Sequence, residues 1–123
     1  MKNKPQELTK AELEIMQVIW QKEKVLVHDI LAELPEPKPA YNTVSTIVRI
    51  LENKGFVSHK AYGRTYEYFP VVAKEDYTNT YMRTVLDNFF EGSISRMLNF
   101  FSAQKSISLE ETDEILKILN GDK

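Results

Sequence analysis

The order of apolar and polar residues predicts an amphipathic helix near the start of the chain. Apolar side chains recur at helical spacing at Leu13, Met16 and Trp20. Thr9 precedes this run and Glu12 follows it three residues later, the arrangement of a capping box. We therefore expect a first helix that begins just after Thr9 and turns one broad apolar face toward a core.

Two more apolar stripes predict a second and a third helix. The second ends at Pro35, which cannot continue a helix, and its apolar face consists of Val27, Ile30, Leu31 and Leu34. The third runs from about Asn42 to Lys54 and ends with Gly55 as a left-handed cap. Its core-facing stripe follows the i, i+3, i+4, i+7 pattern at Val44, Ile47, Val48 and Leu51.

The opposite face of the third helix has an unusual composition. It presents short hydrogen-bonding side chains and one arginine, namely Asn42, Thr43, Ser45, Thr46 and Arg49. A solvated helix face normally mixes basic and acidic residues, as the first helix does with Lys10, Glu12, Glu14 and Gln17. The third helix is therefore the best candidate for a binding surface.

After Gly55 the pattern changes from helical to extended. The segments Phe56 to Ala61 and Arg64 to Phe69 are rich in aromatic and β-branched residues, and the pair Tyr62-Gly63 links them. They predict a β-hairpin with Gly63 at positive φ, closed by Pro70. The expected fold is mainly α, an α+β winged helix: a three-helix winged helix-turn-helix with a β-hairpin wing.

The pattern of residues 73–123 predicts helices only. They form a three-helix segment that follows the winged-helix domain of residues 1–72. Three short helices cannot bury their apolar faces alone in so few residues. We expect pairing with a second copy, although packing back onto the winged helix would also cover them. The expected dimerisation residues are Tyr81, Val85, Leu86, Phe89, Phe90, Ile94, Leu98, Phe101, Ile115, Leu116 and Leu119.

Composition and charge narrow the class of protein. The 123 residues include no cysteine, and no apolar run approaches the ~20 residues of a membrane span, which favours a cytoplasmic protein without membrane binding of its own. The net charge is −2. Residues 37–66 nevertheless hold five basic residues and a single acidic one, Glu52. Such a run can be an ordinary solvated face, but it is also where a polyanion would dock.

The sequence offers little for catalysis. His28 and His59 fall in different predicted elements, with no partner at metal-ligand spacing. The acidic residues Glu110, Glu111, Asp113 and Glu114 are explained by the dipole at the start of a helix. No Gly-rich phosphate loop or nucleophile elbow is present. We predict a protein that is not an enzyme and that needs no metal or cofactor.

Double-stranded DNA matches the third helix better. Thr43, Ser45 and Thr46 can meet base edges or phosphates, and Arg49 can pair with guanine or neutralise a phosphate. Asn42 can pair with adenine, or it can cap the helix. Lys54, Lys60 and Arg64 would hold the flanking phosphates, which gives affinity and register rather than sequence choice.

Short motifs in a fixed order run through nearly the whole chain: Leu8-Thr9-Lys10-Ala11-Glu12, Ile19-Trp20, Thr43-Val44-Ser45-Thr46, Lys54-Gly55-Phe56-Val57 and Leu98-Asn99-Phe100. Together they resemble the penicillinase-repressor (BlaI/MecI) family of bacterial winged-helix transcriptional repressors. The resemblance implies a homodimer that binds a palindromic operator and blocks transcription, with the C-terminal helices as the dimerisation domain.

The resemblance also implies a mode of regulation. In the best-known members a membrane-associated sensor with a metalloprotease domain triggers cleavage of the repressor at an Asn–Phe bond, and Asn99-Phe100 matches that dipeptide. The same pair also fits an incidental Asn beside a core Phe.

Two departures from the family concern DNA reading. Many members carry Arg and Leu at the positions of Ile50 and Leu51, whereas here the arginine is Arg49, one step or ~100° around the helix. Ser45 stands where some relatives have a basic residue. The family's operator sequence therefore does not transfer directly.

Two other functions remain open from the sequence. A winged helix can dock a protein, but such an interface favours exposed aromatics and Met over the short polar residues seen here. A ligand-gated regulator could form a pocket from Tyr77, Tyr81, Phe89 and Phe90, although such residues are more often plain core.

Overall fold

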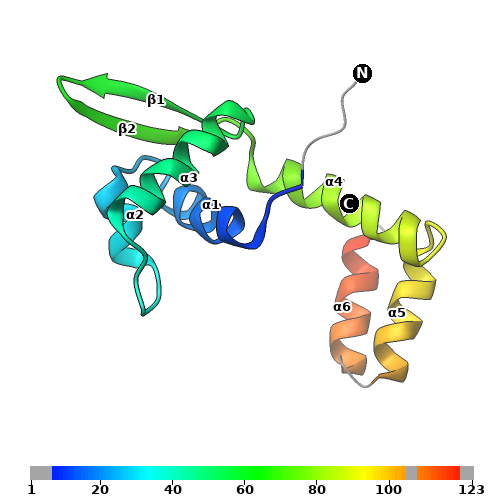
Figure 1. Ribbon diagram of the computed structural model, residues 1–123. Helices are drawn as coiled ribbons and strands as arrows, with labels where there is room; N and C mark the ends of the chain where they lie inside the picture. The colour runs from blue at the N-terminus through cyan, green and yellow to red at the C-terminus, as the bar shows by residue number, and fades with distance from the viewer. Residues whose placement is uncertain (1–6, 105–107, 120–123) are drawn as a thin grey trace. The chain divides into compact units, whose positions relative to one another are not determined.

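The computed structural model describes residues 7–104 and 108–119 of the chain (Figure 1). The described elements follow the predicted order of three helices, a hairpin and further helices. They are α1 (Lys10–Lys22), α2 (Val27–Glu33), α3 (Tyr41–Asn53), β1 (Val57–Tyr62), β2 (Thr65–Pro70), α4 (Lys74–Phe89), α5 (Ile94–Ala103) and α6 (Leu109–Leu119). The chain forms two compact units, Met1–Asn79 and Thr80–Lys123. The described helices include none that is both long and apolar enough to span a membrane.

The first helix begins as predicted. The Thr9 hydroxyl accepts a hydrogen bond from the Glu12 amide at 3.2 Å, and the Glu12 carboxylate accepts one from the Thr9 amide at 2.9 Å. These two bonds satisfy amide groups that have no partner within the helix. The capping box that the sequence predicted is confirmed.

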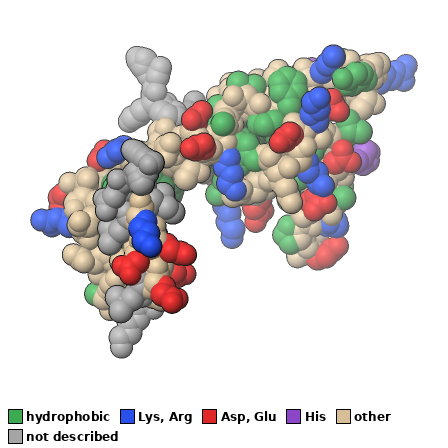
Figure 2. All heavy atoms as spheres, turned by 180° about the vertical axis from the view of Figure 1, so that it is seen from behind, with side chains coloured by type: hydrophobic (Ala, Val, Ile, Leu, Met, Phe, Trp, Pro, Cys, Tyr) green, Lys and Arg blue, Asp and Glu red, His purple; other side chains and the backbone are tan. Residues whose placement is uncertain are grey.

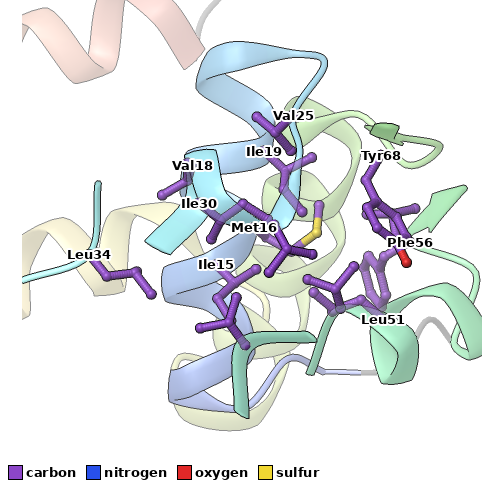
Figure 3. Close-up of a cluster of buried hydrophobic side chains, with 14 of the residues drawn as sticks. Ile15, Met16, Val18, Ile19, Val25, Ile30, Leu34, Leu51, Phe56 and Tyr68 are labelled. Carbon is purple, nitrogen blue, oxygen red and sulfur yellow. The ribbon is translucent and has the colours of Figure 1, made fainter. Parts of the chain in front are cut away.

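The core of the first unit lies where α1, α2 and α3 meet the base of the hairpin. Figure 3 shows side chains from these elements converging, among them Met16, Ile30 and Leu51, and all three are fully buried. The predicted stripe of α3 is buried at Val44, Val48 and Leu51, while Ile47 packs at its margin. The periodicity of the sequence therefore predicted correctly which face of α3 is buried.

Glu12 differs from its expected place on a solvated face. It is the one buried charged residue among the described residues, and both of its carboxylate oxygens bind the Lys54 ammonium, at 2.8 and 2.9 Å. Burial alone would raise the pKa of Glu12, but the hydrogen bonds from Lys54 and Thr9 outweigh burial and lower it below the ordinary value of 4.5. This ion pair joins the start of α1 to the end of α3.

The pKa of Glu12 predicts how the protein responds to acid. A carboxyl group with a lowered pKa in the folded state stabilises the fold above its unfolded pKa, and that stabilisation is lost as the pH falls through the folded pKa. We expect the free energy of unfolding of the wild type to exceed that of Glu12→Gln at neutral pH. The difference should shrink as the pH is lowered below 4.5. Urea unfolding across this range measures it, and a constant difference would contradict the assignment.

The hairpin is antiparallel, and its loop lies one residue later than predicted. Tyr62 pairs with Thr65, so the two loop residues are Gly63 and Arg64 rather than Tyr62 and Gly63. Gly63 has a φ of 64°, as expected for a glycine at the first loop position of a type II′ turn. The strand propensity of Tyr62 explains the shift, because its aromatic ring favours an extended position at the end of β1.

Two features fasten the hairpin and the start of α4 to the helices. Val25 and Tyr68 exchange backbone hydrogen bonds of 2.9 and 2.7 Å, so a short bridge extends the two-stranded sheet. The Tyr77 ring lies 6.0 Å from that of Trp20 and 5.7 Å from that of Phe56. The first turn of α4 therefore packs on the winged helix, and the division between the compact units falls inside α4.

The second unit contains the rest of α4 with α5 and α6. Serine residues cap both later helices: Ser93 accepts from the Arg96 amide at 3.1 Å, and Ser108 forms the predicted capping box with Glu111, with two bonds of 3.0 Å. Leu86 and Leu98 are buried within this unit. The side chains of Leu116 and Leu119 lie outside the described residues.

Candidate nucleic-acid interface

The outward face of α3 carries the polar side chains that the sequence singled out. Asn42, Thr43, Thr46 and Arg49 are exposed and Ser45 is half-buried. The helix begins at Tyr41 with Ala40 as its N-cap residue, and no side chain caps it. The alternative that Asn42 serves as the cap is therefore wrong, which leaves its amide in the first turn for an external partner.

Two apolar residues also reach this surface. Tyr41 is 42% exposed and Ile50 is 40% exposed. Neither residue was predicted from the sequence as part of the site. Ile50 lies outside the apolar stripe of α3, and this position could have marked it as an exposed apolar side chain. Four polar residues and Arg49 still dominate the face, so its chemistry remains closer to base-edge recognition than to the apolar centre of a protein interface.

The hairpin supplies the cationic side chains next to this face. Lys60 on β1 and Arg64 in the loop are both exposed, and the Lys60 ammonium lies 5.5 Å from the centre of the Tyr62 ring. Figure 2 shows basic side chains at the tip of the hairpin. These two charges have the exposure that phosphate contacts require.

Lys54 was expected to bind a phosphate, but the structure gives it a different partner. Its ammonium is only partly exposed and is held by Glu12, so its charge is largely neutralised within the protein. Lys38 is used in a similar way, because its ammonium donates to the backbone oxygens of Leu31, Ala32 and Leu34 at the end of α2. The basic residues of this segment that remain for an anionic partner are Arg49, Lys60 and Arg64.

A side-chain cluster connects α3 to the hairpin. The His59 ring on β1 lies 2.8 Å from the Glu52 carboxylate on α3 and stacks on the Tyr66 ring at 4.2 Å. Burial, and then the charge of Glu52, raise the pKa of Tyr68 beneath this cluster. Glu52, the single acidic residue of 37–66, is thus engaged by His59, and this contact joins β1 to α3.

A concave strip runs between α3 and the hairpin. It encloses about 280 Å³ and is lined by residues of α2, α3 and the hairpin, including His28, Tyr41, Ser45, Arg64 and Tyr66. The rings of His28 and Tyr41 lie 4.7 Å apart. The strip places hydroxyl groups and a guanidinium beside the outward face of α3.

The residues predicted for dimerisation fall into two groups. Phe89 is 72% exposed, Tyr81 and Phe101 are also exposed, and Val85, Phe90, Ile94 and Ile115 are half-buried. Leu86 and Leu98 instead lie within the core of their own unit, so we correct their assignment from partner contacts to internal packing. Phe89 and Phe101 therefore leave apolar surface exposed on the described part of this unit.

The remaining sequence candidates are placed as follows. Asn99 and Phe100 lie inside α5 and both are exposed, with Phe100 at 48%, so Phe100 is not a plain core residue. Tyr77 is partly buried and packs against the core of the first unit. Among the described residues no three His, Cys, Asp or Glu side chains are grouped to hold a metal ion.

Comparison with known proteins adds an independent line of information. Residues 8–121 match the family described as penicillinase repressor. The chain is 31% identical over 124 residues to the penicillinase repressor of Bacillus licheniformis, covering 100% of this chain and 96% of that protein. It is 26% identical over 121 residues to the methicillin resistance regulatory protein MecI of Staphylococcus aureus strain N315, covering 98% of each.

Solved structures agree with the fold of the first unit. The DNA-binding domain of the repressor BlaI is similar with a TM-score of 0.52 and 33% identity, over 63% of this chain and 94% of that domain. The monomeric form of Bacillus licheniformis BlaI, in complex with the blaP half-operator, is similar with a TM-score of 0.50 and 31% identity, over 60% of this chain and 92% of that one.

Proposed function

Because the chain belongs to the penicillinase repressor family, we propose that it is a sequence-specific DNA-binding transcriptional repressor, not an enzyme, that acts in the cytoplasm as a homodimer on a palindromic operator. The observation that carries this proposal is the outward face of α3, whose polar side chains and Arg49 are exposed. The complex of the similar BlaI protein with a half-operator supports it.

In this proposal α3 enters the major groove, where the four base pairs present different donors, acceptors and methyl groups. Asn42, Thr43, Thr46 and Arg49 meet base edges, while Ser45 lies toward the hairpin side. Lys60 and Arg64 bind the phosphates that flank the groove. The contact between His59 and Glu52 keeps these two charges in register with α3.

The second unit provides the two-fold axis. Exposed aromatic side chains such as Phe89 are covered by the same surface of a second copy. A symmetric dimer then presents two copies of α3, and the half-sites lie about one or more helical turns apart, ~10–10.5 bp each. A gel-shift titration with the upstream DNA of the gene, against a scrambled duplex, tests the proposal, and equal affinity for both would overturn it.

Arg49→Ala should weaken binding to the preferred duplex by about 2 kcal/mol, or roughly 30-fold. The loss should be confined to sites with guanine at one position of each half-site, because a guanidinium pairs with guanine in the major groove. Fluorescence anisotropy with single-base variants of the duplex measures it. Arg83→Ala, an exposed arginine on α4, is the matched control. An equal loss for every sequence would make Arg49 a phosphate contact.

Lys60→Ala and Arg64→Ala should each lower the slope of log affinity against log salt concentration by about 2 on the full operator, because the dimer loses one phosphate contact in each half-site. The preference for the operator over other sequences should stay unchanged, since phosphate contacts carry no base information. Lys54→Ala provides a contrast and should change the slope little, because the Lys54 ammonium of the wild type already pairs with Glu12. An unchanged slope in both hairpin variants would show that the hairpin does not contact the DNA phosphates.

We also propose the Asn99–Phe100 bond as the place where a membrane-associated sensor metalloprotease system ends repression. Both residues are exposed, but the bond lies inside α5, so local unwinding must precede cleavage. Mass spectrometry of the repressor from induced cells tests this, since a fragment ending at Asn99 is expected. Full-length protein throughout induction would contradict it.

A further inference from the structure

Ile50 is an exposed aliphatic residue on the mainly polar face of α3. It is 40% exposed, while the core-facing stripe of α3 passes through Val48 and Leu51 on either side of it in sequence. An exposed isoleucine gives up the stabilisation that burial of its side chain would supply. That free energy becomes available when a partner covers this part of α3.

The position of Ile50 on α3 relates it to the candidate recognition residues. It follows Thr46 by four residues and Thr43 by seven, so the three side chains lie on the same side of the helix over two turns. The other flank of α3 faces the hairpin, where Glu52 contacts His59 and Ser45 lines the concave strip. Ile50 is therefore turned away from the hairpin and lies on the same side of α3 as Thr43 and Thr46.

In the major groove, the apolar group that the Ile50 side chain can contact is the C5-methyl group of thymine. Resting on the proposed function, we infer that Ile50 is a specificity-determining residue that contacts a thymine methyl group in each half-site. Arg49 and Asn42 would then read polar edges while Ile50 and Thr46 select thymine through its methyl group. This assignment adds an apolar element to the recognition of the operator.

Replacing single thymines with deoxyuridine tests this inference, because the substitution removes only the methyl group. The preferred duplex is first selected from a random library with the full-length protein. At one thymine position, deoxyuridine placed in a single half-site should weaken wild-type binding about fourfold, the value of one buried methyl group. Ile50→Ala should bind the thymine duplex more weakly and should no longer distinguish thymine from deoxyuridine at that position.

Val71→Ala is the matched control, since Val71 is another exposed apolar residue of the first unit and lies outside α3. It should keep the fourfold effect. Circular dichroism of Ile50→Ala should match the wild type because the side chain is not part of the core. The inference is overturned if Ile50→Ala retains the full methyl effect, or if no thymine shows one. Failure to select any preferred duplex would instead refute the proposed repressor function.

Discussion

Replacing Glu12 with alanine should lower the free energy of unfolding by about 2 kcal/mol, because it removes the hydrogen-bonded ion pair with the partly exposed Lys54 and a capping interaction of α1. Glu12 is buried and binds the Lys54 ammonium with both oxygens. The same carboxylate also accepts from the Thr9 amide, so the capping box of α1 is lost as well. Urea unfolding at neutral pH measures the change.

Matched variants separate the two roles of Glu12. Glu12→Gln keeps an oxygen for the Thr9 amide but removes the charge, while Glu14→Ala removes an exposed acid from the same helix. We expect an intermediate loss for the first and little change for the second. In a double-mutant cycle, adding Lys54→Ala to Glu12→Ala should cost less than Lys54→Ala alone. Additive effects would show that the two side chains do not interact.

Phe89→Glu should raise the dissociation constant of the dimer by roughly 100-fold, or about 3 kcal/mol. The Phe89 ring is 72% exposed in the single chain, so the substitution removes little from the core of its own unit. At the proposed dimer interface it replaces a large apolar contact with a charge that would be desolvated without a partner. Operator affinity should fall with the loss of the dimer, because in the proposed complex each monomer holds one half-site.

Sedimentation equilibrium gives the dissociation constant, and anisotropy on full and half operators gives the loss of affinity. Val71→Glu places the same charge at an exposed apolar position of the first unit and should leave the dimer intact. Affinity for an isolated half-site should be the same for Phe89→Glu and the wild type. A Phe89→Glu protein that sediments as the wild type does would remove α4 from the interface.

The predictions from sequence succeeded where the signal was local. The capping box of α1 depends on residues three apart, and the core stripe of α3 on a repeat within one helix. Both followed from spacing alone. The predicted hairpin loop was wrong by one residue. Several strand registers place Gly63 in the loop, and Tyr62 beside it favours a strand position.

In the candidate site, contacts between residues far apart in the sequence could not be predicted from local patterns. Lys54 and Glu12 are 42 residues apart, and no periodicity shows that folding would join them. The count of basic residues in 37–66 therefore included Lys38 and Lys54, whose ammonium groups bind partners within the protein. Ile50 was missed for another reason, since it belongs neither to the apolar stripe nor to the polar set that the sequence defined on α3.

The packing of Trp20 has a practical consequence. It is the single tryptophan of the chain, its indole N–H donates to the Val72 oxygen at 2.9 Å, and its ring neighbours that of Tyr77. Its fluorescence emission is thus a built-in optical reporter of whether the first turn of α4 is seated on α1. Spectra recorded with and without operator would follow that one junction without any added dye.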